Sequence, residues 1–132
     1  MDLSKILSIS GKNGLFKLVN QGKNNVIVES LEDGKRMPAF SHDGIATLDN
    51  ISIFTYDDDV TLESVFQSIY KKENGAATPD FGNDGAKMRT YFEEILPNYD
   101  KERVYVSNIK KVYAWYHNLI DLEAKQNEKT EE

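Results

Sequence analysis

The hydrophobic and polar positions of the first part of the chain repeat with a period of two. Such alternation puts every second side chain on one face of a β-strand. It occurs in LFKLV from Leu15 and in ISIFTY. NNVIVESL is instead rich in β-branched residues, which favour strands, and the Glu32-Asp33-Gly34 that follows it is a hairpin turn signal. KRMPAFS also fits a strand, but Pro38 lacks an N–H and therefore belongs at an edge or a bulge. We expect strands within residues 15–56, with KILSIS as a further edge segment.

The period changes to that of a helix after about residue 60. Apolar residues there recur at i, i+3, i+4 and i+7, which is the spacing of one helix face. The predicted helices cover residues 61–73, 84–96 and 107–123. Thr61 or Asp59 can cap the first helix, Asp84 the second and Ser107 the third, and Pro97 ends the second helix.

Strands followed by helices indicate an α+β fold. Four short strands at close spacing suggest a small SH3-like β-barrel or a curled antiparallel sheet, followed by a three-helix C-terminal unit. The turn-rich stretch HDGIATLDN is long enough for a 3₁₀ turn between the last two of these strands. We therefore expect an SH3-like β-subdomain at 1–58, a three-helix subdomain at 59–124 and a disordered acidic tail at 125–132.

Composition narrows the classes of function. A chain of 132 residues with 39% hydrophobic and 29% charged residues fits a globular protein of one domain or two small subdomains. It has no cysteine, which excludes disulfides, thiolate metal sites and cysteine nucleophiles. The net charge of −6 argues against broad phosphate binding. A local basic patch is still compatible with it, because the block Asp57–Asp59 and the tail carry much of the negative charge.

The chain shows no signal for membrane insertion or export. No apolar run approaches the ~20 residues of a membrane span, and the start MDLSKILSIS has no signal-peptide pattern. We therefore expect a cytoplasmic protein that does not enter a membrane.

The acidic block Asp57–Asp59, with Glu63 nearby, raises the question of a cation site. Consecutive carboxylates on an extended chain point to alternate sides, and the spacing is not that of a calcium loop. Acidic residues here favour the dipole of the following helix and are expected to be exposed. The only histidines, His42 and His117, form no metal-binding or nucleophile pattern. We predict no catalytic residue, no metal site and no cofactor, while an enzyme with an unrecognised site stays open.

Asp100 and Arg103 precede the last predicted helix and stand three residues apart. At this spacing two side chains are neighbours on a helical turn and can form an ion pair. We expect this pair to fix the turn that leads into the last helix, as a structural rather than a catalytic feature.

The stretch KKVYAWYHNLI has an unusually wide apolar face when it is placed on a helix. The residues of the central face, expected to be buried, are Ile109, Val112, Tyr113, Tyr116 and Ile120. Residues on one flank extend the apolar arc to about half the circumference, beyond the ~100° of a surface helix. Trp115 on this flank should pack either on the β-subdomain or on another chain. The candidate partner-binding residues are Lys111, Trp115, Leu119 and Leu122.

Four stretches are characteristic when they are taken in order. They are MDLSKILSISGKNGLFKLV, IVESLEDGKR, ISIFTYDDDVTLESVF and YFEEILPNYDKERVYVSNIKKVYAWYHNL. Together they resemble a family of short uncharacterised proteins from Bacteroidetes, catalogued as domains of unknown function, up to about Leu122. The C-terminal motif of that family typically has Asp where this chain has Asn108. The resemblance implies a bacterial cytoplasmic protein and implies no activity.

The function favoured by the sequence is that of a noncatalytic interaction module, which binds a protein partner or forms a homodimer. A nucleic-acid- or ribosome-associated small-barrel protein is the first alternative and rests on fold analogy alone. An enzyme with an unrecognised site is the second. A contiguous basic face would favour nucleic acid, and a deep pocket with convergent polar groups would favour an enzyme.

Overall fold

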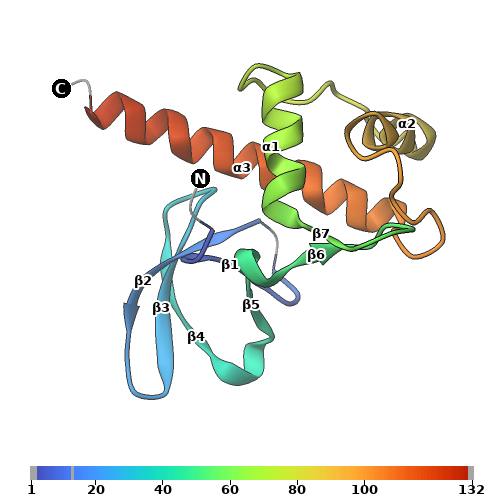
Figure 1. The fold of residues 1–132 in the computed structure, drawn as a ribbon. Coiled ribbons are helices and arrows are strands. Elements are labelled where there is room, and N and C mark those ends of the chain that lie inside the picture. The colour runs from blue at the N-terminus through green and yellow to red at the C-terminus, as the bar shows by residue number, and fades with distance from the viewer. Residues whose placement is uncertain (1–2, 13, 131–132) are drawn as a thin grey trace. The chain divides into compact units, whose positions relative to one another are not determined.

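The computed structural model describes residues 3–12 and 14–130, without the side chains of Ser41 and of residues 124–130. The chain forms two compact units, Met1–Ile51 and Ser52–Glu132 (Figure 1). Strands make up the first unit and three helices dominate the second, so the expected α+β class is confirmed. The predicted division into subdomains 1–58 and 59–124 stays a prediction.

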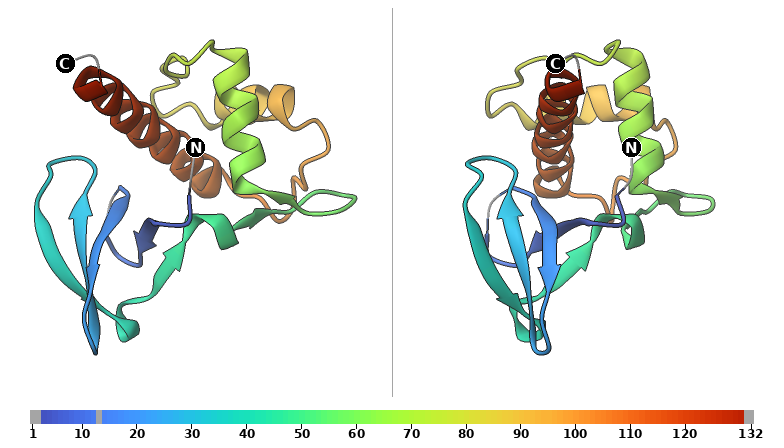
Figure 2. Two further views of the ribbon diagram at one scale, coloured as in Figure 1. Left: turned by 60° about the vertical axis from the view of Figure 1, so that its left-hand side comes forward. Right: turned by 90° about the vertical axis from the view of Figure 1, so that its left-hand side faces the viewer.

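The first unit is a five-stranded antiparallel sheet with the strand order β4-β3-β2-β1-β5. Its strands are β1 (Ile6–Ile9), β2 (Phe16–Gln21), β3 (Asn25–Ser30), β4 (Arg36–Phe40) and β5 (Ile45–Thr47). Two 3₁₀ helices, η1 (Ser41–Asp43) and η2 (Leu48–Asn50), flank β5. Figure 2 shows β2 and β3 side by side as one long, twisted hairpin. The sheet is not closed within the described residues, so an antiparallel sheet is confirmed and a closed barrel is not.

The predicted strand set was wrong at three places. KILSIS contains β1, which is not an edge segment, because it pairs with β2 on one side and with β5 on the other. The turn-rich stretch HDGIATLDN holds the expected 3₁₀ structure but also supplies β5, a strand that was not predicted. ISIFTY does not join this sheet, because its strand β6 (Ser52–Ile53) pairs with β7 (Val60–Thr61) in the second unit. Each error concerns pairing between distant residues, which local alternation does not specify.

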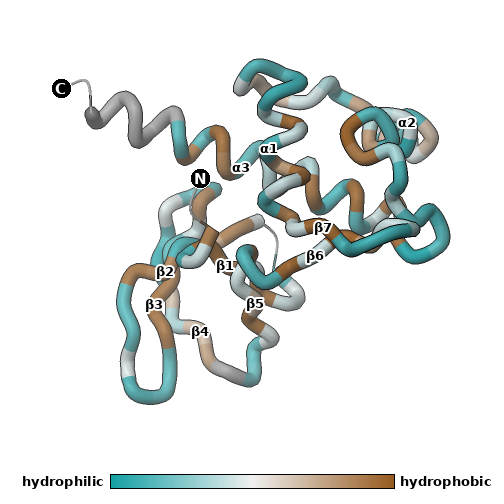
Figure 3. Tube along the Cα trace, viewed as in Figure 1, coloured by the Kyte–Doolittle hydropathy of each residue, from teal (hydrophilic) through white to brown (hydrophobic). Residues whose placement is uncertain are grey.

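The core of the sheet comes from alternate positions on neighbouring strands. Its buried members are Leu7, Ile9, Phe16, Val28 and Ala39, with partly buried neighbours on β2 to β5. A bulge between Leu18 and Asn20 leaves Val19 without a partner on β3, and Val19 is exposed. Figure 3 shows the tip of the β2–β3 hairpin as hydrophilic, which agrees with its composition of glutamine, glycine, lysine and asparagine.

The turn signal at Gly34 and the edge signal of Pro38 are confirmed. Gly34 has a φ of 74°, a left-handed conformation that glycine adopts without strain, and its N–H donates to the Ser30 carbonyl at 2.9 Å. The Asp33 side chain accepts from the Lys35 N–H at 2.9 Å. Pro38 lies on β4, at an edge of the sheet, as its missing N–H requires.

The second unit contains the β6–β7 hairpin and three helices. The helices are α1 (Leu62–Lys72), α2 (Gly85–Ile95) and α3 (Val106–Thr130). Thr61 caps α1 by accepting from the Ser64 N–H, and Asp84 caps α2 by accepting from the Lys87 N–H, as predicted. α2 contacts both α1 and α3.

Both ends of α3 differ from the prediction. The helix begins at Val106, before the expected cap Ser107, and the Asn108 side chain accepts from the Tyr105 N–H at 2.9 Å. An aspartate at position 108 can accept the same bond. The helix continues to Thr130 instead of ending at 123, so residues 125–130 are helical rather than a disordered tail. Lysine, glutamate and glutamine favour helices and explain the extension; residues 131–132 lie outside the described residues.

Aromatic rings fill the core of the second unit. Phe92 lies edge-on to Tyr99, with ring centroids 5.0 Å apart, and Tyr91 lies edge-on to Tyr113 at 5.6 Å. Phe66 on α1 is fully buried, as are Phe92 and Tyr99. All of these rings except Tyr99 come from positions that helical spacing marked as apolar, which explains why the helices were predicted closely.

Candidate functional site

The predicted partner-binding stripe of α3 is exposed only in part. Lys111 is exposed, Trp115 and Leu122 are half-buried, and Leu119 is buried with 3% of its surface exposed. A surface on this flank would therefore consist of Lys111, Trp115 and Leu122, without Leu119. Its role in binding stays a prediction.

The central face of α3 is structural, as expected. Val112, Tyr113 and Tyr116 are buried, while Ile120 is only half-buried. The Tyr113 hydroxyl donates to the Met88 carbonyl and the Tyr116 hydroxyl to the Ala76 carbonyl, each at 2.7 Å (atoms O to O). Burial raises the pKa of both hydroxyls, to about 12 for Tyr116. These groups stay protonated at neutral pH and act as donors that hold other segments against α3.

His117 holds the loop between α1 and α2. Its Nε2 atom accepts from the Thr78 N–H at 3.1 Å, and the Thr78 hydroxyl lies 2.9 Å from the same atom. An Nε2 that accepts must be unprotonated, so the neutral ring carries its proton on Nδ1. Burial lowers the pKa of His117, against an opposing effect of Asp121. This histidine is therefore a structural acceptor.

The most strongly organised surface of the second unit joins the β6–β7 hairpin to the segment before α3. We call it the hairpin–turn surface; it comprises residues 54–59 and 98–103. Backbone bonds connect its two parts, from the Tyr56 N–H to the Asn98 carbonyl at 3.0 Å and from the Asp100 N–H to the Phe54 carbonyl at 2.9 Å. Thr55 and Tyr99 form an isolated antiparallel bridge between them. The two parts are thus fixed to each other through the main chain.

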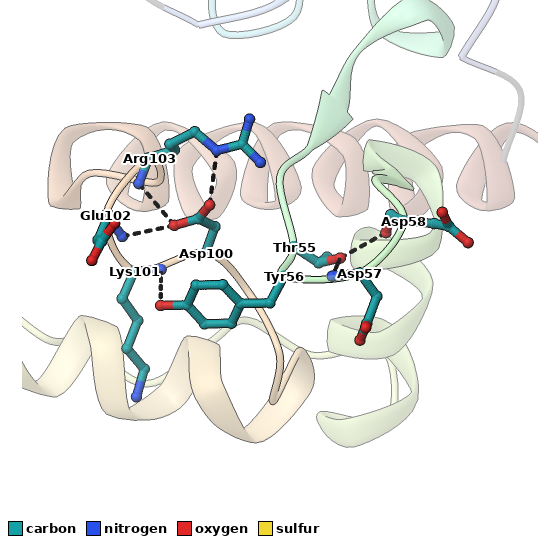
Figure 4. A network of polar contacts seen from close by, with 8 residues as sticks. All are labelled: Thr55, Tyr56, Asp57, Asp58, Asp100, Lys101, Glu102 and Arg103. Atoms are coloured by element: carbon teal, nitrogen blue, oxygen red, sulfur yellow. Dashed lines mark hydrogen bonds and ion pairs between the residues drawn. The ribbon is translucent and has the colours of Figure 1, made fainter.

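The Thr55 side chain fixes the backbone of the acidic block at Asp57 and Asp58. Its side chain is buried, its hydroxyl donates to the Asp58 carbonyl at 2.7 Å, and the same oxygen accepts from the Asp57 N–H at 3.1 Å (Figure 4). The Asp57 carboxylate also accepts from the Asn98 side-chain amide at 2.9 Å. All three aspartates, Asp57, Asp58 and Asp59, are exposed, as the sequence predicted.

Asp100 and Arg103 form the predicted pair, and the pair has more contacts than its spacing indicated. The Asp100 carboxylate accepts from Arg103 Nε at 2.8 Å and from the backbone N–H groups of Glu102 and Arg103 at 3.0 and 3.2 Å (Figure 4). The bond from Arg103 lowers the pKa of Asp100 and raises the pKa of Arg103. The pair therefore fixes the turn before α3 and stays ionised at neutral pH.

Two aromatic rings lie on the hairpin–turn surface and are held in place while exposed. Phe54 is 41% exposed, and the Arg103 guanidinium lies over its ring at 4.2 Å from the centroid. Tyr56 is 59% exposed, and its hydroxyl accepts from the Lys101 N–H at 3.1 Å. The alternation of ISIFTY put these aromatics on one face of a strand. It did not indicate that the face would be exposed.

Chemically, this surface offers rings and charges rather than a reaction centre. No group of three or more potential metal ligands occurs in the described part of the chain. A concavity beside the β2–β3 turn of the first unit is lined by the described residues Gln21, Gly22, Lys23, Asn24, Asn25, Val26, Ala39 and Ile45. This lining has no carboxylate, histidine or hydroxyl group that could serve as an acid, base or nucleophile. Among the described helices, none is both long and apolar enough to cross a bilayer.

Comparison with known proteins assigns the chain to a family. A family model described as Domain of unknown function (DUF6852) matches residues 51–120, more than half of the chain. The chain belongs to this family. A second model, described as Domain of unknown function (DUF5606), matches residues 3–48, so the two matches fall in different compact units. The resemblance to Bacteroidetes proteins of unknown function is confirmed.

A solved relative covers both units of this DUF6852 protein. A solution NMR structure of a protein from Bacteroides vulgatus is similar to it, with 42% sequence identity and a TM-score of 0.68. The match covers 90% of this chain and 86% of that one. No curated protein matches the chain. These comparisons assign no function, so the reading of the function as unknown is confirmed.

Proposed function

We propose that this protein is a noncatalytic interaction module that binds a protein partner through the hairpin–turn surface. The observation that carries this proposal is the pair of exposed aromatic rings, Phe54 and Tyr56, each held by a contact from residues 101–103. Tyrosine and arginine are enriched among the residues that dominate protein interfaces.

The fixed geometry of these side chains supports a role in binding. Fixing a flexible side chain at an interface costs about 0.5 to 1.5 kcal/mol of binding free energy. Phe54, Tyr56 and Arg103 are already placed in the free chain by the contacts of the hairpin–turn surface. A partner would therefore meet a surface that requires little ordering.

The flank of α3 is a second proposed contact. Lys111 is exposed, and Trp115 and Leu122 each keep part of their apolar surface accessible. We propose that this flank contributes to binding of the same partner or of a second copy of the chain. Tryptophan is the most enriched residue type at interface hot spots, together with tyrosine and arginine.

The alternatives have less support. A nucleic-acid-binding protein needs a basic face, whereas the hairpin–turn surface carries three consecutive aspartates and the chain has a net charge of −6. An enzyme needs convergent acid, base or nucleophilic groups, and the concavity of the first unit has amides and one lysine as its polar lining.

We further propose that the five-stranded sheet is an SH3-like unit of a cytoplasmic protein. The return of the chain from β4 through a 3₁₀ helix to β5, which pairs with β1, supports this arrangement. The absence of cysteine is compatible with a reducing compartment.

Affinity capture from native cell extract tests the proposed function. The full chain is compared with Tyr56→Ala and with a matched control, Tyr70→Ala, which removes a 41% exposed tyrosine from α1. We expect a protein that is retained by the wild type and by Tyr70→Ala and is lost with Tyr56→Ala. Retention should survive nuclease treatment.

Loss of the retained protein on nuclease treatment would favour the nucleic-acid alternative instead. Equal capture by Tyr56→Ala and the wild type would contradict the hairpin–turn surface as the binding site. Light scattering on the purified chain reports self-association in the same variants. Circular dichroism confirms that each variant is folded.

A further inference from the structure

We infer that the hairpin–turn surface recognises a basic, Lys- or Arg-rich segment of a partner protein. This inference rests on the proposed function and names the chemistry of its partner. Two features of the surface carry it, namely the accessible ring of Tyr56 and the excess of carboxylates beside that ring.

The cations of the surface are already paired within the chain. Arg103 pairs with Asp100 at 2.8 Å, and Lys101 pairs with Glu93 of α2 at 3.4 Å. In contrast, no side chain of the described residues forms an ion pair with Asp57, Asp58 or Asp59. The charge that the surface offers to a partner is therefore negative, which attracts basic segments and repels phosphates.

The exposed ring adds a second contact for a cation. Cations are attracted to the faces of aromatic rings, and Arg103 shows this within the chain by lying over Phe54. Tyr56 is the more exposed of the two rings, at 59%, and the described cations that lie over rings are Lys72 on Tyr91 and Arg103 on Phe54. A partner lysine or arginine can therefore lie on the Tyr56 ring.

The arrangement fits an extended segment rather than a single ion. In Figure 4 the Tyr56 ring lies toward Lys101, whereas the carboxylates of Asp57 and Asp58 extend on the other side of the hairpin turn. One ion cannot contact the ring and both carboxylates when these groups diverge. Several cations along one peptide can contact the ring and both carboxylates at the same time. The hydrogen bonds of Thr55 already fix the turn that carries these carboxylates.

Titration with synthetic peptides tests this inference on the full chain. The probe is a peptide of alternating lysine and glycine, and its controls are an arginine–glycine and a glutamate–glycine peptide of equal length. Backbone amide shifts in NMR spectra locate the binding. We expect both basic peptides to shift residues 54–59 and 98–103, and the acidic peptide to leave them unchanged.

Variants separate this surface from the general negative charge of the chain. Tyr56→Ala should weaken binding of the basic peptides about two- to fivefold, the range of an exposed cation–π contact. The double variant Asp58→Asn with Asp59→Asn should weaken it about two- to tenfold, as loss of two exposed ion pairs predicts. The matched control, Glu32→Gln with Asp49→Asn, removes two exposed carboxylates from the first unit and should have less effect.

Three results would overturn the inference. The first is no binding of the basic peptides up to about 1 mM. The second is that shifts concentrate outside the hairpin–turn surface. The third is that the Glu32→Gln/Asp49→Asn control weakens binding as much as the Asp58→Asn/Asp59→Asn variant, which would indicate a net-charge effect.

The capture experiment distinguishes failure of this inference from failure of the proposed function. If the peptides do not bind but Tyr56→Ala still loses its partner from extract, the partner chemistry is wrong and the interaction function stands. If Tyr56→Ala instead abolishes self-association, the occupant is a second copy of the chain and the basic-segment inference is wrong. If the peptides bind but no captured protein depends on Tyr56, the proposed function fails while the peptide site stands.

Discussion

The contact between His117 and Thr78 should make the stability of the second unit depend on pH. Thr78 lies in the loop between α1 and α2, is 8% exposed, and donates its backbone N–H to His117 Nε2. Protonation of Nε2 removes the lone pair that accepts this bond. The folded chain therefore favours neutral His117, which agrees with its lowered pKa.

The direction of the effect follows from proton binding. His117 has a pKa below 6.5 in the folded chain, whereas in the unfolded chain its pKa returns to about 6.5. Between these two values the unfolded chain binds more protons, so the free energy of unfolding rises with pH. The stabilisation is complete above about pH 6.5 and is lost as the pH falls toward the folded pKa.

Removal of the imidazole should cost about 1 to 3 kcal/mol at about pH 8, because the Thr78 N–H then has no acceptor in a buried position. The variant is His117→Ala, and urea denaturation followed by circular dichroism measures its free energy of unfolding. As the pH falls from about 6.5 toward the folded pKa of His117, the difference from the wild type should shrink, since the stabilisation of the wild type is progressively lost. His42→Ala removes an exposed histidine and serves as the control.

A second variant, Thr78→Val, separates the two contacts of the ring. It keeps the backbone N–H of residue 78 and removes the hydroxyl. That hydroxyl oxygen is the group that accepts a hydrogen bond from Nε2 when the ring is protonated. We expect the pKa of His117, measured by NMR titration, to be lower in Thr78→Val than in the wild type. A constant difference in stability between His117→Ala and the wild type across this pH range would refute the reasoning.

Three further predictions concern the second unit. Arg103→Ala should lower the urea midpoint, because it leaves the Asp100 carboxylate without its guanidinium; an unchanged midpoint would mean that the pair is not structural. Calcium should not raise the melting temperature, because Asp57, Asp58 and Asp59 are exposed and the carboxylates of Asp57 and Asp58 diverge; a rise of several degrees would reveal a binding loop. Trp115→Ala should weaken partner capture or self-association seen by light scattering, whereas a loss of about 3 to 5 kcal/mol would assign Trp115 to internal packing.

The helices could be predicted from the sequence because their signals are local. α1 and α2 begin after Thr61 and Asp84, whose side chains cap the first turn, and their apolar spacing selects the buried face. The position of the first turn of α3 was missed by only one residue. Its C-terminal extension was missed because polar residues with good helix propensity carry no apolar period.

The sheet could be predicted only in part, because strand pairing is not local. β2 follows from alternation, β3 from its β-branched residues and the turn at Gly34 from turn chemistry. β5 has three residues, too few for an alternating pattern to be recognised, and it pairs with β1 from the start of the chain. ISIFTY has the pattern of a strand, but its Thr55 bridges Tyr99, far along the sequence.

The candidate site could likewise be predicted only where its signals are local in the sequence. The spacing of Asp100 and Arg103 predicted their ion pair correctly. The exposure of Phe54 and Tyr56 could not be predicted, because alternation identifies a face but not what covers it. The partner of His117 could not be predicted either, since Thr78 lies in a loop without any periodic pattern.

The β4 edge of the sheet is poorly suited to pairing with an added strand. On β4, Arg36, Pro38 and Phe40 alternate in phase, so their backbone N–H positions face the same side. Pro38 has no N–H, and the outward-facing N–H of Phe40 already donates to the Asp43 carboxylate at 2.8 Å. Two of the three positions that a strand on this edge would need are therefore blocked. This edge is therefore a poor template for an added strand, which is consistent with the proposal that a partner binds through the side chains of the hairpin–turn surface.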